Sequence, residues 1–504
     1  MLSFVNSYIM SPAVTVILLI AGLYFTFRLR LSPVRILRAL TAKRPGSGIS
    51  PFRAVTVALA GTLGVGNIVG VASAISLGGP GAVFWMWVSA IVVMALKYAE
   101  VVLSVKYRRT DGADDNVKID SAAGVNSRPA KADTETISYH GGPFYYIADG
   151  LGMKRTARIY AVVLALDSFA LGCIIQTKAA ADGMRGAFGL PNIATGIIIG
   201  VLMLAVTVFG IGGISEVTVR LIPFLTIGYT LLSLCIILPF AGYLPEIFAE
   251  IFRSAFSPAT VPGAGVAALT GAFNLTALRF GVARGIFSNE AGCGSSGIAH
   301  AAADASSPAD QGAWGVFEVF ADTIILCGLT ALVILIARRV APEINSLSGG
   351  GMDVVSAAFG GGLYAAVGKA LGAAPEICSA AARLAVSFIG SSVCAYALAT
   401  VISWSHYGAE AMRFLTGRSA GWQRIVYLCC CAVFCAVGAV TPEGLAWDFA
   451  DIAIALMTAI NTICVIKLRR EIITETLLTD NRKGMYNKTM DYHGKFFSEK
   501  RSTT

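Results

Sequence analysis

The stretch Thr62-Leu63-Gly64-Val65-Gly66-Asn67 lies in the middle of an apolar segment that is long enough to cross a membrane. Glycine costs about 1 kcal/mol relative to alanine in a helix interior, and a buried asparagine needs a hydrogen-bonding partner. The stretch therefore predicts a helix that is broken at membrane depth, with free backbone groups facing a cavity. Secondary transporters bind ions and charged solutes at such breaks. The alternative is a small-residue surface for helix packing, which explains the glycines but not the asparagine.

The composition is that of a membrane protein. Hydrophobic residues make up 56% of the 504 residues and charged residues 14%, whereas soluble domains contain about 25% charged residues. The net charge of +9 does not indicate nucleic-acid binding, because the basic residues gather in a few loops and the C-terminal tail. The eleven cysteines and four histidines form no pattern typical of a transition-metal site.

Apolar segments predict eleven membrane-spanning helices and hence an all-α polytopic fold. With this number of spans, the two basic loops and the basic tail fall on one side of the membrane. The positive-inside rule then places the N-terminus outside and the C-terminus in the cytoplasm. The predicted spans are about 8–27, 53–76, 82–106, 157–181, 190–210, 217–240, 263–286, 313–338, 379–405, 424–441 and 445–467.

The first span stands apart, and the other ten divide into two sets of five. Residues 1–52 form the extra helix with its basic loop, and residues 53–240 and 263–467 form the two sets. Because five is odd, the sets run in opposite senses, and each opens with a glycine-containing span. This pattern predicts an inverted repeat whose first and sixth core helices are broken, the second break being expected around Gly271, which is assigned to the substrate site.

Four stretches outside the spans complete the predicted organisation. Residues 111–138 form a polar cytoplasmic insertion, and residues 241–262 form an external loop with short helices. Residues 340–376 are glycine-rich and predict an external hairpin or lid, since the glycine runs interrupt a helical pattern. Residues 468–504 form a cytoplasmic tail.

The break at Thr62–Asn67 offers groups for two kinds of ligand. Free N–H groups at the start of the outer half-helix suit a carboxylate, so we predict that Val65, Gly66 and Asn67 bind a substrate. Free carbonyl groups at the end of the inner half-helix suit Na⁺. The predicted cation ligands are Ala60, Thr62, Leu63 and the Asn67 side chain.

Charged residues within the spans have structural explanations as well as functional ones. Lys97 and Glu100 are three residues apart on one helix face, which predicts an ion pair near the cytoplasmic end. Arg284, Asn289 and Glu290 fall at the inner end of the sixth core span and predict a cytoplasmic gate network.

Four more carboxylates lie in or near the spans. A proton relay is one interpretation, because carboxylates within a membrane are usually functional. Structural roles near helix ends are the preferred interpretation. The four residues are Asp167, Asp182, Glu318 and Asp322.

Several long motifs resemble the alanine/glycine:cation symporter family. They are Gly78–Val88 (GGPGAVFWMWV), Lys97–Glu100 (KYAE), Gly141-Gly142-Pro143 before an aromatic run, and Gly281–Gly292 (GVARGIFSNEAG). The resemblance extends from about Phe4 to the tail. It implies the inverted-repeat fold of the bacterial leucine transporter, preceded by one extra span. It also implies a Na⁺-driven, sometimes H⁺-driven, importer of alanine or glycine.

The resemblance implies roles for three more side chains. Gln176 matches a glutamine that faces the amino acid, although an interhelix hydrogen bond is the alternative. Trp404 matches a tryptophan that closes the pocket, and its alternative is an interfacial aromatic. Thr400 matches a sodium ligand, and its alternative is a bond to its own helix.

Four positions depart from the family pattern. Val65 stands where threonine is common, Ala399 where a hydroxyl is common, Ser403 where glycine is common and Cys293 where leucine is common. The first three of these departures leave the choice of substrate and ion open, without indicating a loss of transport.

The sequence therefore predicts a secondary active symporter, not an enzyme, that imports alanine or glycine with a Na⁺ gradient. Its expected partners are a small neutral amino acid, Na⁺ and the lipid bilayer of a bacterial plasma membrane, which is the inner membrane if the cell is Gram-negative. No organic cofactor is expected, and the oligomeric state is left open. Alternatives are proton-coupled import of the same amino acid, of serine or of D-alanine, and more remotely a channel or a membrane enzyme.

Overall fold

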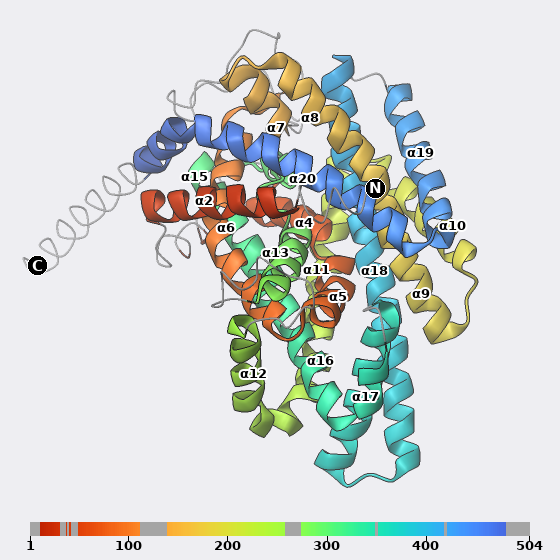
Figure 1. Cartoon of the computed structure of the whole chain (residues 1–504). Helices are drawn as coiled ribbons and strands as arrows, with labels where there is room; N and C mark the ends of the chain where they lie inside the picture. The colour runs from red at the N-terminus through yellow and green to blue at the C-terminus, as the bar shows by residue number, and fades with distance from the viewer. Residues whose placement is uncertain are drawn as a thin grey trace, which may run out of the picture.

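The computed structural model describes residues 11–30, 37, 40–41, 49–110, 139–257, 274–347, 351–417 and 421–479. Two predicted features, the insertion at 111–138 and Gly271, lie outside these residues. Across the described part of the chain nearly all regular structure is helical, and the two-residue strands β1 (Arg109–Thr110) and β2 (Tyr139–His140) pair antiparallel. Figure 1 shows the helices packed around a common centre.

The helices follow in chain order as α2 (Ser11–Leu29), α4 (Pro51–Thr62), η2 (Val65–Asn67), α5 (Val69–Gly78), α6 (Gly81–Lys106), α7 (Pro143–Tyr145), η3 (Tyr146–Gly150), α8 (Lys154–Asp167), η4 (Ser168–Ile175), α9 (Gln176–Phe188), α10 (Asn192–Thr207), α11 (Gly210–Ile237), η5 (Leu238–Tyr243), α12 (Leu244–Phe256), α13 (Leu275–Asn289), α14 (Gly297–Ala301), α15 (Pro308–Val319), η7 (Phe320–Cys327), α16 (Gly328–Val340), η8 (Pro342–Ser346), α17 (Met352–Leu371), α18 (Pro375–Thr416), α19 (Gly421–Val440) and α20 (Glu443–Lys467).

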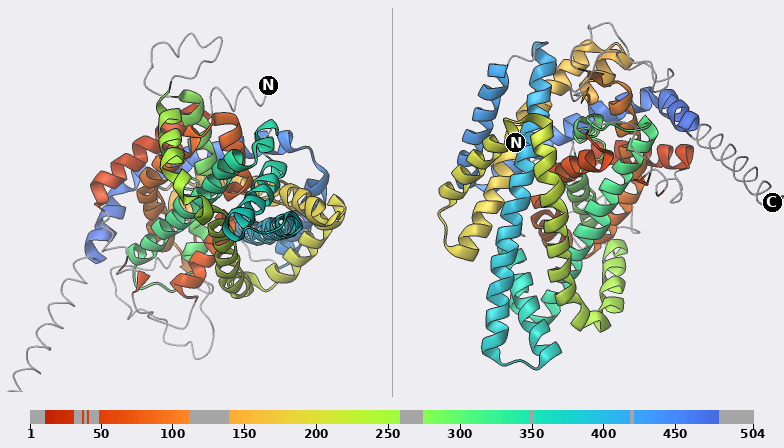
Figure 2. Two further views of the ribbon diagram at one scale, coloured as in Figure 1. Left: turned by 90° about the horizontal axis from the view of Figure 1, so that it is seen from below. Right: turned by 180° about the vertical axis from the view of Figure 1, so that it is seen from behind.

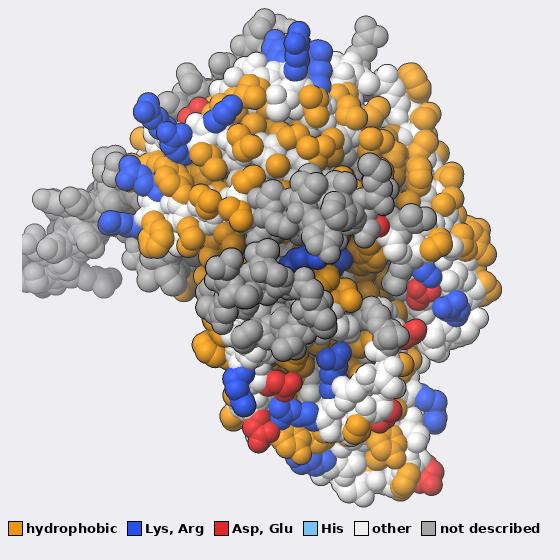
Figure 3. Space-filling view, in the orientation of Figure 1, with side chains coloured by type: hydrophobic (Ala, Val, Ile, Leu, Met, Phe, Trp, Pro, Cys, Tyr) orange, Lys and Arg blue, Asp and Glu red, His pale blue; other side chains and the backbone are white. Residues whose placement is uncertain are grey.

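Eight helical stretches are long and apolar enough to cross a membrane, counted over the described residues. Shorter apolar helices at Val14–Leu29, Val69–Gly78 and Asn192–Thr207 coincide with three further predicted spans. The chain is therefore a multi-pass helical membrane protein. In Figure 3 apolar side chains cover much of the visible face, and charged side chains gather mostly toward its ends.

Burial separates inner helices from outer ones. In an apolar 18-residue segment of α6, 78% of the segment is buried within the protein. In the corresponding segments of the α11–α12 stretch and of α19, 33% is buried. The inner helices meet around α18, which is 42 residues long and packs against α4, α8, α9, α11 and α17. Figure 2 shows α18 running along most of the length of the molecule.

Capping residues fix where the helices around the centre begin. Ser50 accepts a hydrogen bond from the backbone N–H of Arg53 (3.1 Å) at the start of α4, and Pro51 occupies the first helical position, where its missing N–H costs nothing. Asn274 caps α13 by accepting from Ala277 (3.0 Å). Such caps satisfy N–H groups that would otherwise be unpaired within an apolar environment.

Helix α17 fills most of the stretch that the sequence predicted as a hairpin or lid. Gly360, Gly361 and Gly362 lie inside this continuous helix, so the predicted interruption at these glycines is wrong. Their physical role is close packing: a Cβ atom on Gly362 would lie 2.9 Å from Ile236 of α11, and one on Gly360 would lie 3.0 Å from Val386 of α18. Figure 1 shows α17 beside α18, at the same end of the molecule as α12.

The amphipathic helix α12 confirms the short helix predicted in the loop at 241–262. Ile247 and Ile251 are buried, while Phe248 and Phe252 on the opposite side are 46% and 56% exposed. The Phe252 ring also packs edge-on against Phe84 of α6, with ring centroids 5.5 Å apart. The loop is therefore anchored to the helix bundle.

Residues 469–479 form a final helical stretch that lies along the end of α6. The Lys106 ammonium lies 3.1 Å from the Glu471 carboxylate and 3.2 Å from that of Glu475. The Tyr98 hydroxyl forms a hydrogen bond with the Thr476 hydroxyl (3.1 Å). The described chain thus ends against a helix from its first quarter.

Candidate functional site

The first predicted helix break is present. Helix α4 ends at Thr62, α5 begins at Val69, and one short turn, η2, lies between them. The Asn67 side chain bridges the gap, because its Oδ1 accepts a hydrogen bond from the Gly64 N–H (3.0 Å). Its Nδ2 donates to Oδ1 of Asp322 (2.7 Å), which secures the break to η7.

Three predicted site residues, Val65, Gln176 and Thr400, come together around Gly64. The Val65 N–H donates to Oε1 of Gln176 (3.1 Å), and the Gln176 Nε2 donates to the Leu171 carbonyl (3.3 Å). A Cβ atom on Gly64 would lie 2.6 Å from Oγ1 of Thr400 and 2.9 Å from Oε1 of Gln176. Glycine is therefore required here because two polar side chains approach the backbone closely. Gly66, also predicted, faces the end of α13 instead, near Phe287 and Ser288.

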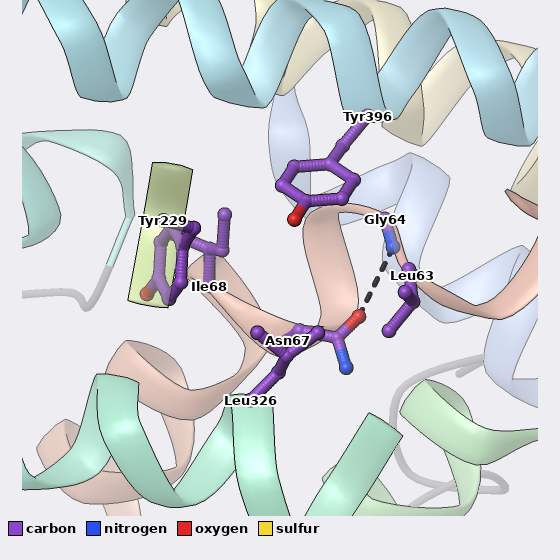
Figure 4. Close-up of a pocket in the computed structure, with 7 residues that line it drawn as sticks. All are labelled: Leu63, Gly64, Asn67, Ile68, Tyr229, Leu326 and Tyr396. Atoms are coloured by element: carbon purple, nitrogen blue, oxygen red, sulfur yellow. Dashed lines mark hydrogen bonds between the residues drawn. The ribbon is translucent and has the colours of Figure 1, made fainter. Parts of the chain in front are cut away.

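A small pocket lies on one side of the break. Figure 4 shows Leu63, Gly64 and Asn67 in its wall, and the hydrogen bond between the last two. Tyr229 of α11 and Tyr396 of α18 line the pocket, although sequence reasoning did not single them out. The remaining lining residues are Ile68 and Leu326.

Tyr229 belongs to a chain of hydrogen bonds that reaches the break. Its hydroxyl forms a hydrogen bond with Oγ1 of Thr330 (2.6 Å), and Thr330 donates to the Asn67 carbonyl (2.8 Å). Periodicity could not have predicted this chain, because its members come from α11, α16 and η2. The only signal for this chain in the sequence was the presence of Tyr229 and Thr330 within apolar helices.

The predicted cation ligands are buried at the end of α4, and their hydroxyl groups already have partners. Thr62 donates to the Ala58 carbonyl (3.3 Å) and Thr400 donates to the Tyr396 carbonyl (3.1 Å). Each bond lies within its own helix, which is the arrangement that the alternative interpretation of Thr400 predicts. Their oxygen lone pairs remain available to a cation, and Ala60 is fully buried between these helices.

The second described interruption lies at residues 290–296, between α13 and α14. The sequence predicts the second break around Gly271, which lies outside the described residues, and assigns Glu290 to a gate. Positive φ angles at Glu290 (51°), Gly292 (92°) and Gly294 (84°) turn the chain here. The motif NEAGCG is the signal for this turn, because two of the three residues with positive φ are glycines.

Trp404 holds this second interruption together. Its indole Nε1 donates to Oε1 of Glu290 (2.8 Å), while Ser295 donates to the other carboxylate oxygen (2.5 Å). Trp404 is fully buried and is not among the residues that line the pocket. It lies one helical turn beyond Thr400, against Gly172, whose Cβ position would be 2.5 Å from that of Trp404.

The predicted gate residues Arg284, Asn289 and Glu290 contact other elements, and no side-chain hydrogen bond or ion pair joins one of them to another among the described residues. Arg284 lies 3.4 Å from the Asp451 carboxylate and 4.3 Å from the centroid of the Trp447 ring, both on α20. Asn289 donates to the Thr323 hydroxyl (3.0 Å). The positive φ at Glu290 turns the chain away from the end of α13, and the role of these residues in a cytoplasmic gate stays a prediction.

The predicted ion pair between Lys97 and Glu100 is wrong. The Lys97 ammonium lies 3.2 Å from the Glu318 carboxylate and donates to Ser296 (2.7 Å), and both charged side chains are fully buried. Glu100 accepts from Asn461 instead (2.6 Å). Spacing along one helix suggested a local ion pair. A partner from another helix neutralises this buried charge instead.

His300 completes this cluster on the far side of Glu318. Its Nε2 lies 2.9 Å from Oε2 of Glu318, and its Nδ1 lies 2.8 Å from Nε2 of Gln311. The cluster joins α6, α14 and α15 beside the second interruption. By holding these three helices together, the cluster can close the site at the end where the second interruption lies.

The remaining carboxylates differ in their surroundings. Asp182 lies 2.9 Å from Lys178 and 3.4 Å from Arg185, which is a surface ion-pair arrangement. Asp167 is fully buried, and no side-chain hydrogen bond to its oxygens is present among the described residues. Asp322 lies at the break and accepts from three side chains. It does not meet Glu318, which pairs elsewhere.

Comparison with known sequences identifies the family. The sequence pattern of the sodium:alanine symporter family matches residues 1–118 and 130–490, which is nearly the whole chain. The chain belongs to the sodium:alanine symporter family. The family resemblance read from the motifs is thereby confirmed, and sodium-coupled amino-acid symport is the activity of this family.

Individual relatives cover almost the entire chain. A sodium/alanine symporter of Methanococcus maripaludis is 33% identical over 94% of this chain and 95% of its own length. An uncharacterised transporter of Haemophilus influenzae is 35% identical, with 94% of each chain covered. A probable sodium/glutamine symporter of Bacillus subtilis is 29% identical over 93% of this chain and 88% of its own.

One solved structure of a Na⁺-coupled sialic acid symporter, in its substrate-bound outward-open state, also matches. It covers 93% of this chain and 83% of its own at 12% identity, with a TM-score of 0.48. This likeness is too weak to add to the family assignment.

Proposed function

We propose that this member of the family imports a small neutral amino acid, alanine or glycine, with a sodium gradient, by alternating access. The observation that carries the proposal is the helix break at Gly64 and Asn67, where the Val65 N–H and the Gln176 side chain meet beside a small pocket. The pocket is narrow and is lined by seven residues, among them Tyr229 and Tyr396, so it favours a small solute. The relative from Bacillus subtilis that is a probable sodium/glutamine symporter indicates that substrates differ within the family.

The break supplies the chemistry that such a solute requires. Its carboxylate would take the Val65 N–H from Gln176 and approach Gly66, where the start of the outer half-helix is positive. Gln176, once released, offers both a donor and an acceptor to the amino acid. The cation would bind where Ala60, Thr62, Leu63 and Thr400 present oxygens at the negative end of α4.

The finer architecture is part of the proposal. We expect eleven spans, with α2 as the extra one, and two inverted sets of five whose first helices are interrupted at 63–68 and 290–296. From the basic loops we expect the N-terminus outside and the C-terminus in the cytoplasm of a bacterium. The proposed cytoplasmic end then carries the cluster of Lys97, Glu318 and His300, and the pocket is on the outward side of Trp404.

The proposal is tested by uptake into proteoliposomes that contain the full-length protein. Labelled alanine, glycine, serine, D-alanine and glutamine are offered with a Na⁺ gradient, with a proton gradient, and with neither. Na⁺-dependent uptake of alanine or glycine is expected, and acceleration of uptake by preloaded alanine distinguishes a carrier from a channel. Uptake driven only by protons would favour the proton-coupled alternative, and no uptake of any small neutral amino acid would overturn the substrate class.

Asn67→Ala and Gln176→Ala are expected to abolish this uptake. Asn67 links Gly64 to Asp322, and Gln176 holds the Val65 N–H, so each variant leaves buried polar groups at the break unpaired. Asn192→Ala is the matched control, because this half-buried amide bonds Asp182 far from the break. Normal uptake by both site variants, with the same amount of protein in the membrane, would refute the site assignment.

A further inference from the structure

We infer that the Asp167 carboxyl group is a proton-binding site. It holds a proton while the second interruption is packed against α8 and η4, and it releases that proton to the cytoplasm when the interruption moves away. The inference rests on the proposed function and deepens it, because it assigns a bound proton to one step of the alternating-access cycle.

Asp167 is a buried carboxyl group without a hydrogen-bond partner. Its side chain is fully buried, and among the described residues neither of its oxygens accepts a hydrogen bond. The Leu171 N–H approaches the carboxyl group but does not reach hydrogen-bond geometry. Other buried carboxyl groups have partners: Glu100 bonds Asn461, Glu290 bonds Trp404, Glu318 pairs with Lys97, and Asp322 bonds Asn67.

The charged groups that act on Asp167 are acidic. They are Glu290 of the second interruption and Asp451 of α20, and Asp451 already lies 3.4 Å from Arg284. An isolated ionised carboxylate is far more costly to bury than a protonated one, and neighbouring negative charges add to that cost. The protonated form is therefore the one that these surroundings accept. The titratable hydroxyl groups nearby are Tyr160 of α8 and Tyr427 of α19, which act on Asp167, and Tyr407 of α18, which acts on Glu290.

Two contacts hold the second interruption against the helix on either side of Asp167. The Tyr160 hydroxyl, two turns before Asp167 on α8, donates to the Cys293 carbonyl. Beyond Asp167, Trp404 packs against η4 and donates to the Glu290 carboxylate (2.8 Å). Asp167 therefore lies between two points at which the second interruption is attached, and a movement of the interruption would uncover it.

Opening toward the cytoplasm would bring water to Asp167. The residue lies on the proposed cytoplasmic side of Trp404, nearer to the start of α8 with its basic residues Lys154 and Arg155. Water that enters there accepts the proton, so the carboxyl O–H bond breaks and a hydrated carboxylate remains. Closing again requires the proton, because the closed surroundings do not accept the charge. Since the closed form binds more protons, a rise in cytoplasmic pH favours the open form.

Infrared absorption by protonated carboxyl groups of the purified full-length protein tests the inference. Asp167→Asn is expected to remove one such band from the wild-type spectrum at neutral pH. Asp182→Asn is the matched control and should leave that band in place, because Asp182 is ion-paired with Lys178 at 2.9 Å. Equal carboxylic-acid absorption in the wild type and Asp167→Asn would overturn the inference, and so would an equal loss in Asp182→Asn.

Tyr160→Phe keeps the inference testable if Asp167→Asn fails to elute as a monodisperse protein. Loss of the bond to Cys293 is expected to make opening about tenfold easier. The pH at which the band is half lost should then fall by about one unit, because easier opening lets the proton leave at a lower pH. An unchanged pH of half-loss would refute release through this movement.

Uptake in proteoliposomes tests the role of the proton in the cycle. Above the pH of half-loss, Na⁺-driven alanine uptake by the wild type is expected to fall about tenfold for each further pH unit. Asp167→Asn, which resembles the protonated form, should lose this dependence, whereas Asp182→Asn should keep it. The same pH profile in the wild type and Asp167→Asn would contradict the inference.

Failure of the two proposals is distinguishable. A wild type that shows the Asp167-dependent band but transports no small amino acid refutes only the transport proposal. Na⁺-driven alanine uptake without that band refutes only the proton site.

Discussion

At the scale of single residues, the site depends on one position without a side chain. Gly64 has no positive φ angle, so its requirement is one of space and not of backbone conformation. Thr400 and Gln176 occupy the volume that a Cβ atom would need. Both side chains are predicted ligands, and Gly64 is what lets them approach the same break.

Gly64→Ala is therefore expected to reduce sodium-driven alanine uptake at least tenfold, because the new methyl group would displace Thr400 or Gln176. Gly70→Ala is the matched control, since this buried glycine of α5 has no atom within 4 Å of its Cβ position. Uptake rates in proteoliposomes, normalised to reconstituted protein, measure both variants. Equal rates for the two would show that the contacts of Gly64 are unimportant.

At the scale of helices, close packing depends on glycine at the contact between α6 and α13. A Cβ atom on Gly281 would lie 2.3 Å from the Ala82 carbonyl oxygen and 2.9 Å from Cβ of Trp85. Backbone atoms cannot yield as a flexible side chain can. Small residues allow membrane helices to approach in this way.

Gly281→Ala is expected to destabilise the protein by about 1–3 kcal/mol, the range for an overpacked interface. Its thermal unfolding midpoint in detergent should fall relative to the wild type. Gly212→Ala, at a site in α11 with nothing within 4 Å, should keep the midpoint or raise it slightly, since alanine favours a helix. A Gly281→Ala variant as stable as the control would contradict the close contact.

The buried ion pair between α6 and α15 permits a second test at this scale. Lys97→Met leaves the Glu318 carboxylate with His300 as its remaining basic partner among the described residues. Breaking a buried pair in this way costs about 3–5 kcal/mol. Lys97→Met combined with Glu318→Gln should recover much of that loss in the unfolding midpoint, because the uncompensated charge is gone. A double variant less stable than Lys97→Met alone would exclude this explanation.

These contacts also explain which elements the sequence could predict. The break at Gly64–Asn67 was predictable because two glycines and an amide stand inside an apolar run. The turn at 290–296 was not, because the surrounding polar motif was interpreted as a helix end. The partner of Lys97 could not be predicted either, since spacing identifies neighbours on the same helix only. For the same reason the tyrosines of the pocket, Tyr229 and Tyr396, were missed.

At the scale of the whole molecule, the charges of the loops predict how the chain lies in the membrane. The basic segments, which include β1 and the end of α6, are expected to be cytoplasmic, and the turn near Gly79 external. A fluorescent protein fused after Thr504 should therefore fold and fluoresce, whereas alkaline phosphatase should be active when fused after Gly79. Phosphatase activity from a fusion at the C-terminus would reverse the proposed orientation.

The contact between the C-terminal stretch and α6 has a consequence for biosynthesis. Tyr98 and its partner Thr476 are separated by 378 residues. Synthesis proceeds at about 5–20 residues per second, so roughly 20–75 s pass between the emergence of the two from the ribosome. Throughout that interval Lys106 is without Glu471 and Glu475. Among the described residues, the end of α6 is consequently one of the last parts of the first half to be completed, and a nascent chain released before residue 476 leaves this contact open to quality-control proteases.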